Sequence, residues 1–261
     1  SLMTQTYNSK VLIGNWSEDL ELKELRIKEF MERKGKSELL LSKTQTVLQQ
    51  NLSPVELTVS EDGNVRYGDV IMLFNHATSG PVAVNMADPA NNMEGAYNTT
   101  TAQSSEPQAR TAFTIERAPS GPSLMGHSDD IVRYGDLVHL VCHQALSSDK
   151  VLFLQSELIT PTKYSKYSRH QQVVVSEDPD YNTVWRFAAF DPQYRVEMEG
   201  EPVTQNATVL LMHQNTNQCL GSTKKAYRNL FGVEWEMFAK TLLDSHKAEK
   251  DENKFSIMGG K

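Results

Sequence analysis

The run His139-Leu-Val-Cys142-His143 has the residue types most suited to metal binding in this sequence. On a helix the two histidines would share a face, as a pair of zinc ligands must. The surrounding repeat places them on a strand, where they are about 13 Å apart at about 3.3 Å per residue. Zinc–nitrogen bonds are about 2 Å long, so one zinc ion cannot bind both. We therefore expect no metal site here, with Cys142 facing the core beside Val138 and Leu140.

Two carboxylates, Asp69 and Asp136, could act as catalytic acids, since each follows a Tyr-Gly pair. Their recurrence in an internal repeat argues against this, because repeat-related residues lie apart in space and the third copy has Ala207. The sequence also lacks the motifs GxxxxGK[ST], GxGxxG, GxSxG and HExxH. We expect a structural role for both carboxylates, and a non-enzymatic protein without a cofactor.

Basic and aromatic residues alternate in the run PTKYSKYSRH, and a second basic cluster follows near residue 225. Such runs contact nucleic acid or an acidic protein surface, or are simply solvated loops. The formal net charge of −7 and a pI of about 5.5 argue against nucleic acid and against a membrane surface as partners. The candidate protein contacts in the two clusters are Lys163, Lys166, Arg169, Lys224, Lys225 and Arg228.

An internal repeat is the most informative pattern in the sequence. VRYGDVIML begins at Val65, VRYGDLVHL begins 67 residues later at Val132, and the weaker VTQNATVLL begins 71 residues after that at Val203. The repeated positions that we assign to structure are Tyr67, Gly68, Asp69, Tyr134, Gly135, Asp136 and Asn206. Glycine and asparagine tolerate positive φ best, so we expect a tight turn or bulge at each copy.

Further strand-like segments follow each copy at similar distances, and each unit ends in an aromatic-led strand beginning at Phe113, Trp185 or Phe255. Three four-stranded units predict a mainly β protein: a closed barrel with a hairpin cap, the β-trefoil. Two sets of residues should then be equivalent inside the barrel. They are Ile71, Val138 and Val209, and Leu73, Leu140 and Leu211.

The predicted domains are an N-terminal arm, residues 1–54, and a β-trefoil, residues 55–261. The three units span about 55–120, 121–192 and 193–261. Residues 76–110, rich in small and polar residues, contain the middle strands of unit one but are expected to form mostly a long mobile loop. The arm should contain one helix from Ser17 to Lys34 and a second around Glu38–Gln49.

The first helix has two apolar stripes, one with Leu20, Ile27 and Met31 and one with Leu22 and Leu25 nearly opposite. Either the helix contacts both its own domain and a partner, or it is tucked between loops of its own chain. The candidate partner contacts in the arm are Asn15, Trp16, Leu22 and Leu25.

The two cysteines are too few for a secreted disulfide scaffold, and no apolar run approaches the roughly 20 residues of a membrane helix. We therefore expect a soluble protein of a reducing compartment, in which the glycosylation sequons occur by chance.

The order and spacing of several short segments resemble the cilia- and flagella-associated protein 161 family, over nearly the whole chain. These segments include Ile13-Gly14-Asn15-Trp16, Tyr67-Gly68-Asp69, Asp191-Pro192-Gln193, Thr216-Asn217 and Leu243-Asp244-Ser245-His246. The VRYGD units also resemble the MIR repeat, a β-trefoil unit.

This resemblance implies a microtubule inner protein of the ciliary or flagellar axoneme, in the cytoskeleton of the cytoplasm. Members of this family lie in the A-tubule lumen of doublet microtubules near the seam. They contact α/β-tubulin and other inner proteins and have no known catalytic activity. The alternative from the fold alone is a carbohydrate- or small-ligand-binding β-trefoil. The third unit lacks the Tyr-Gly-Asp set, which weakens that alternative.

Overall fold

The computed structural model describes residues 16–36, 39–91, 93–119 and 130–260. The chain divides into two compact units between Val47 and Leu48, earlier than the predicted boundary at residue 54. The reason is that residues 48–54 join the β unit: the N–H of Arg110 donates to the carbonyl of Asn51, and Pro54 bridges to Gln108.

The predicted helices are present as α1, Trp16–Gly35, and α2, Leu40–Asn51. Acidic side chains in the first turn of α1 and basic ones in its last turn complement the helix dipole. Leu22 and Leu25 are 47% and 60% exposed. Neither helix, nor any other in the described ranges, is long and apolar enough to cross a membrane.

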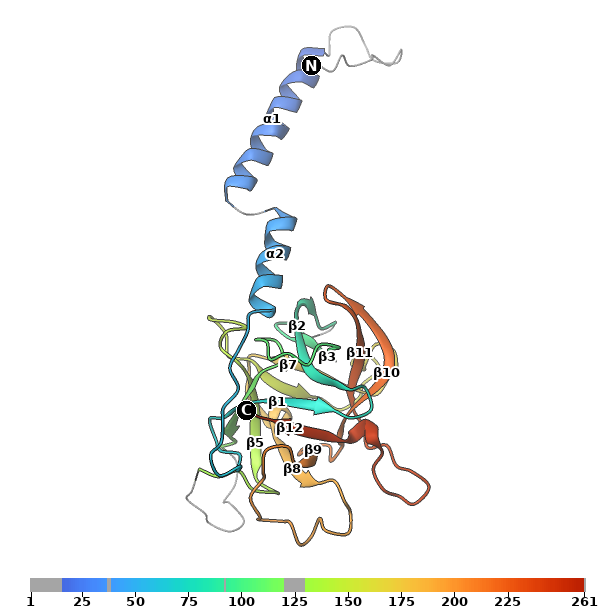
Figure 1. Ribbon diagram of the computed structural model, residues 1–261. Helices are drawn as coiled ribbons and strands as arrows, with labels where there is room; N and C mark the ends of the chain where they lie inside the picture. Colours follow the sequence, from blue (N-terminus) through green and yellow to red (C-terminus); the bar gives the residue numbers. More distant parts are fainter. Residues whose placement is uncertain (1–15, 37–38, 92, 120–129, 261) are drawn as a thin grey trace. The chain divides into compact units, whose positions relative to one another are not determined.

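Six of the described strands pair antiparallel in a closed ring, in the order β1–β4–β5–β8–β9–β12 and back to β1 (Figure 1). Their bounds are β1 Val70–Asn75, β4 Phe113–Arg117, β5 Leu137–Cys142, β8 Trp185–Ala189, β9 Thr208–His213 and β12 Phe255–Met258. A ring of this kind satisfies the edge of each strand with the next one.

Three hairpins stand on this ring and cover one end of it (Figure 1). They are β2 Gly80–Pro89 with β3 Tyr97–Thr101, β6 Phe153–Ser156 with β7 Gln171–Ser176, and β10 Leu220–Asn229 with β11 Gly232–Ala239. Strands β3, β7 and β11 pair with one another, which joins the three hairpins into a single cap.

The ring repeats one register three times. The opposed pairs are Ile71 with Phe113, Val138 with Trp185, and Val209 with Phe255. All six side chains are fully buried, as are Leu73, Leu140 and Leu211. The equivalence predicted for these residues is therefore confirmed.

The turn before each repeat strand also recurs. Gly68, Gly135 and Asn206 have φ of 93°, 89° and 63°, and their N–H groups donate to the carbonyls of Ile115, Phe187 and Ile257. The carboxylates of Asp69 and Asp136 accept from the backbone N–H three residues earlier, at 2.7 and 3.0 Å. Both aspartates thus close a turn, as expected of structural residues.

Three buried valines join the starts of the units in a cycle. The N–H of Val132 donates to the carbonyl of Val65, that of Val203 to Val132, and that of Val65 to Val203, at 2.8–2.9 Å. Each unit is therefore bonded to both others before its first strand begins.

The middle strands expected for unit one within residues 76–110 are β2 and β3, and they take up more of this segment than its composition suggested. Its polar composition misled the prediction. Thr99, Thr100 and Thr101 are buried, and their hydroxyls bond to Val173, Glu234 and Ser222. Threonine is also β-branched and favours strands.

Candidate partner-binding surface

The two predicted basic clusters come together on the cap. The loop 157–170, between β6 and β7, lies against β10. The rings of Tyr167 and Tyr227 meet edge to face, 5.5 Å apart, and Lys166 Nζ lies 5.0 Å from the centre of the Tyr227 ring. Cation–π contact of this kind holds the ammonium group in place while it remains exposed.

Glu236 on β11 fixes the position of this loop. Its carboxylate accepts hydrogen bonds from the N–H groups of Tyr167 and Ser168, at 2.6 and 2.9 Å. Glu236 is buried. Charge-assisted bonds to a buried carboxylate are strong, so the loop is anchored rather than merely resting on the hairpin.

We call the resulting surface the cationic face. Its members, all exposed, are the basic residues of the loop and of β10, namely Lys166, Arg169, Lys224, Lys225 and Arg228. Across the join, Lys166 lies by Tyr227 and Lys225 acts on His170. Lys163 differs from the prediction, since it is half-buried and pairs with Glu157 at 2.6 Å. It therefore adds little net charge to the face. A concentration of positive side chains on a chain of net charge −7 suits an acidic partner.

The pKa of His170 depends on charges of this face. Burial lowers the pKa of His170, and the neighbouring Lys240 and Lys225 lower it further. Both lysines therefore act on one imidazole at the join between the loop and the hairpin.

Replacing Lys225 with glutamate is expected to raise the pKa of His170, because a repulsive charge becomes an attractive one. Titration of the imidazole protons by NMR measures this directly. Lys150→Glu, on an exposed lysine beside Glu177, serves as the control and should leave the His170 curve in place. If the His170 titration curve were unchanged in Lys225→Glu, the charge at residue 225 would not influence the loop that carries the first basic cluster.

A polar cavity of about 270 Å³ opens beside Lys166, where the three hairpins meet. Asp88, Asn98, Tyr164 and Gln172 are among the side chains that line it. The Tyr227 hydroxyl donates to Asp88 at 2.5 Å. Burial, and then this bond, raise the pKa of Tyr227, so the phenol stays protonated. The cavity thus offers both donors and acceptors next to an aromatic wall.

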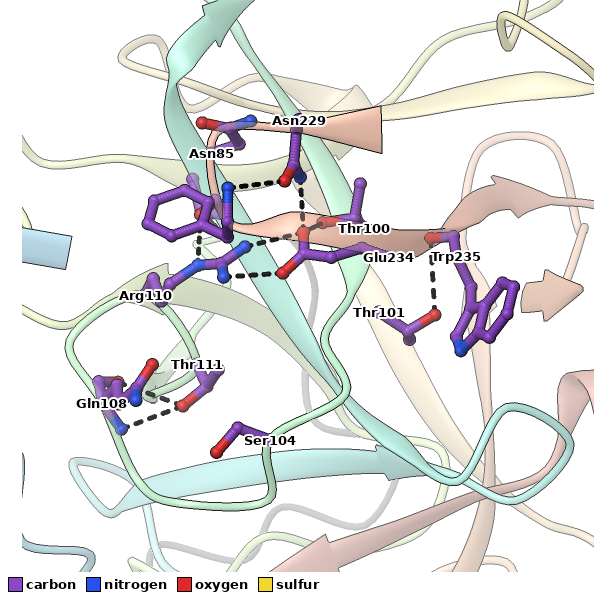
Figure 2. A network of polar contacts seen from close by, with 12 residues as sticks. Asn85, Thr100, Thr101, Ser104, Gln108, Arg110, Thr111, Asn229, Glu234 and Trp235 are labelled. Atoms are coloured by element: carbon purple, nitrogen blue, oxygen red, sulfur yellow. Dashed lines mark hydrogen bonds and ion pairs between the residues drawn. The ribbon is translucent and has the colours of Figure 1, made fainter. Parts of the chain in front are cut away.

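A buried ion pair holds the β10–β11 hairpin in place (Figure 2). Arg110 and Glu234 are 2% and 3% exposed, and their two parallel bonds measure 2.7 and 2.9 Å. Thr100 and Asn229 each donate to the same carboxylate at 2.6 Å, and the Phe231 ring lies 3.7 Å from the guanidinium carbon. Burial raises the pKa of Glu234, but the bonds and charge of Arg110 outweigh it, and the pKa is lowered.

This network spans elements that are distant in the sequence. Arg110 also donates from Nε to the carbonyl of Val84 on β2, at 3.1 Å. Arg110 therefore links the β10–β11 hairpin, through Glu234, to the β2–β3 hairpin, through Val84. The β10–β11 hairpin also carries Lys224, Lys225 and Arg228. It therefore holds both Glu234 of the buried pair and three residues of the cationic face.

Neither Arg110 nor the glutamates were among the predicted functional residues, because their partners are more than 60 residues away in sequence. One signal was available. In the strand GVEWEMFA, Glu234 and Glu236 alternate with Val233, Trp235 and Met237. Charged residues at every second strand position indicate either a solvated face or buried charges with partners.

The remaining predicted contacts lie elsewhere. Asn15 is outside the described residues, and Trp16 begins α1. Leu22 and Leu25 belong to α1 in the other compact unit. The loop and β10, which carry the two basic clusters, contact each other in the β unit, whereas Trp16, Leu22 and Leu25 belong to the other compact unit.

His139 and Cys142 lie on β5, as predicted, but His143 follows the last residue of this strand. His139 is buried on β5, with Nδ1 3.0 Å from the Thr183 hydroxyl, and Cys142 lies in the core with Val138 and Leu140. Within the described ranges, no three His, Cys, Asp or Glu side chains are grouped so as to hold a metal ion.

Sequence comparison identifies the family. The family model of the cilia- and flagella-associated protein 161-like domain matches residues 43–260. The chain belongs to this family. The zebrafish (Danio rerio) cilia- and flagella-associated protein 161 is 36% identical, with 95% of this chain and 86% of that protein covered. The mouse (Mus musculus) protein of the same name is 33% identical, with 97% and 88% covered.

Solved structures share the fold at low identity. An SDF2-like protein from Arabidopsis thaliana has a TM-score of 0.57 at 18% identity, over 74% of this chain and 94% of its own. A Caenorhabditis elegans protein of unknown function has a TM-score of 0.58 at 15% identity, over 78% and 100%. At these identities the likeness concerns the architecture of the β unit alone.

Proposed function

We propose that this protein is a structural component of ciliary and flagellar axonemes. In this proposal it lies in the lumen of the A-tubule near the seam and binds α/β-tubulin and other microtubule inner proteins. Membership of a family whose relatives are named for cilia and flagella carries the proposal. The resemblance noted in the sequence supplies the lumenal position. No catalytic role is part of it.

We also assign the β unit to the MIR-like β-trefoil. The support is the threefold recurrence of one strand register, one positive-φ turn and one valine hydrogen bond. In a closed ring with a joined cap, most strand edges are paired within the protein. Copies held close together in an assembly therefore have few free edges through which to associate.

The cationic face is the proposed tubulin contact. Tubulin is acidic, and this face presents five exposed basic side chains on an anchored loop and a fixed hairpin. The arm is the proposed second contact, through Trp16, Leu22 and Leu25 and the preceding Asn15. Two linked contacts bind more tightly than either alone, because the second binding event becomes intramolecular.

A tagged copy expressed in a ciliated cell is expected to remain with the doublet microtubules. Isolated axonemes would be stripped of membrane, soluble matrix and dynein arms with detergent and high salt. A protein in the tubule lumen is shielded from this treatment, so most of the tagged copy should stay in the doublet fraction. A dynein-arm subunit, which high salt releases, serves as the extraction control.

Release of the tagged copy with the soluble matrix would instead favour a ligand-binding β-trefoil. One observation supports that second candidate: the polar cavity at the cap, with its mixture of donors and acceptors beside Tyr164. Polar ligands are recognised by such convergent groups.

A further inference from the structure

The loop that carries part of the cationic face begins with a motif that neither the fold nor the proposed docking explains. Residues 160–163 read Thr-Pro-Thr-Lys. A hydroxyl residue followed directly by proline, with a basic residue two positions after the proline, is the substrate pattern of proline-directed protein kinases. Proline favours an extended conformation at the preceding residue, which is the form of a peptide in a binding groove.

The motif is accessible on the folded protein. Thr160, Pro161 and Thr162 are exposed, and the two residues before them, Leu158 and Ile159, are exposed as well. The segment therefore presents a continuous run of surface residues rather than a single exposed hydroxyl.

Hydrogen bonds between Thr160 and Lys163 close the segment into a turn at the surface. Thr160 and Lys163 exchange backbone hydrogen bonds at 3.2 and 3.3 Å, and the Lys163 N–H also donates to the Thr160 hydroxyl at 3.0 Å. The Thr160 hydroxyl also lies 3.4 Å from that of Thr162, and the half-buried Lys163 pairs with Glu157. Exposed surface turns outside the strands open locally at lower free-energy cost than the core, so a kinase can extend the segment without unfolding the barrel.

We propose that Thr160 is a phosphorylation site, and that its phosphate weakens the binding of acidic partners to the cationic face. The inference rests on the proposed function for the identity of that partner. The same loop carries Lys166 and Arg169 and is anchored by Glu236, and Thr162, two residues after Thr160, lines the same cavity as Lys166. The phosphate therefore adds negative charge to the loop that holds these positive charges.

The reaction is an ordinary phosphoryl transfer from ATP. The Thr160 hydroxyl oxygen bonds to the γ-phosphorus, the bond from that phosphorus to the bridging oxygen breaks, and ADP leaves. The hydroxyl proton passes to the catalytic base of the kinase. The product adds about −1.5 to −2 charges at neutral pH. The backbone N–H of Lys163 already donates to the Thr160 oxygen, so it is placed to donate to the phosphate as well.

The first test is modification of the full chain. Purified protein would be incubated with ATP and a purified cyclin-dependent kinase, and the sites mapped by mass spectrometry. Phosphate is expected on Thr160, absent in Thr160→Ala, retained in Thr162→Ala and strongly reduced in Pro161→Ala. A free peptide of residues 156–167 is the activity control. Phosphorylation of that peptide but not of the folded chain would overturn the proposal.

The second test measures the electrostatic consequence with a defined acidic probe. Binding of a fluorescein-labelled polyglutamate peptide would be compared for the unmodified and the phosphorylated chain at low salt. At least fivefold weaker binding is expected after phosphorylation, and equal binding would overturn the proposed effect. Because the probe is not tubulin, failure of the chain to bind tubulin would count against the proposed function alone.

Discussion

Replacing Glu234 with alanine is expected to lower the free energy of unfolding by about 3–5 kcal/mol, the usual cost of leaving one member of a buried ion pair without its partner. The Arg110 guanidinium is 2% exposed and would lose both of its carboxylate bonds. Thr100 and Asn229 would lose their acceptor as well. Few surface substitutions approach this effect, because water replaces the lost partner there.

Urea unfolding followed by circular dichroism measures the change, with Asp62→Ala as the matched control. Asp62 pairs with Arg66, but the two side chains are 41% and 47% exposed, so that substitution should cost much less than Glu234→Ala. The double variant Arg110→Met, Glu234→Leu should recover much of the stability, since it removes both charges. If Glu234→Ala proved as mild as Asp62→Ala, the network would not support the hairpin.

Reversing the charges of Lys224, Lys225 and Arg228 to glutamate is expected to weaken binding to tubulin at least tenfold, which corresponds to about 1.4 kcal/mol. All three are exposed on β10, so the fold should be unaffected. Like charges facing each other across an interface disfavour association and slow it. The assay is co-sedimentation with microtubules polymerised in the presence of the protein, because lumenal sites are open during assembly.

The control for this experiment must change the net charge equally. Lys150, Lys247 and Lys250 are also exposed but lie outside the cationic face. Their triple replacement by glutamate brings the same charge change and should leave sedimentation nearly as it was. Equal losses in both triple variants would mean that overall charge, rather than this face, governs docking. Weaker binding of the unaltered protein at higher salt would accompany the expected result.

Much of the barrel was predictable because its signals are local or periodic. The spacing of Val65, Val132 and Val203 indicated three units, and the alternation within each copy identified Ile71 and its equivalents as core. The turns at Gly68 and Gly135 were also predictable, since few residues other than glycine adopt positive φ.

The features that the sequence did not predict depend on contacts between distant residues. Strand β3 reads as polar because Thr99, Thr100 and Thr101 satisfy their hydroxyls through residues on other hairpins. The cationic face could be listed as two clusters but not as one surface, because their union depends on Glu236 reaching the backbone of Tyr167 and Ser168. Such pairings between distant residues leave little trace in one sequence.

The ring also dictates when the protein can finish folding. Its closing contact joins β1 to β12, with Met72 opposite Met258, so the first and last barrel strands are neighbours. A ribosome making this chain must release residue 258 before the barrel can shut, and until then β1 lacks its neighbour. Contacts this distant along the chain are typical of slow folders. A chain truncated before β12 is therefore expected to have an open barrel, whose unpaired strand edges favour aggregation.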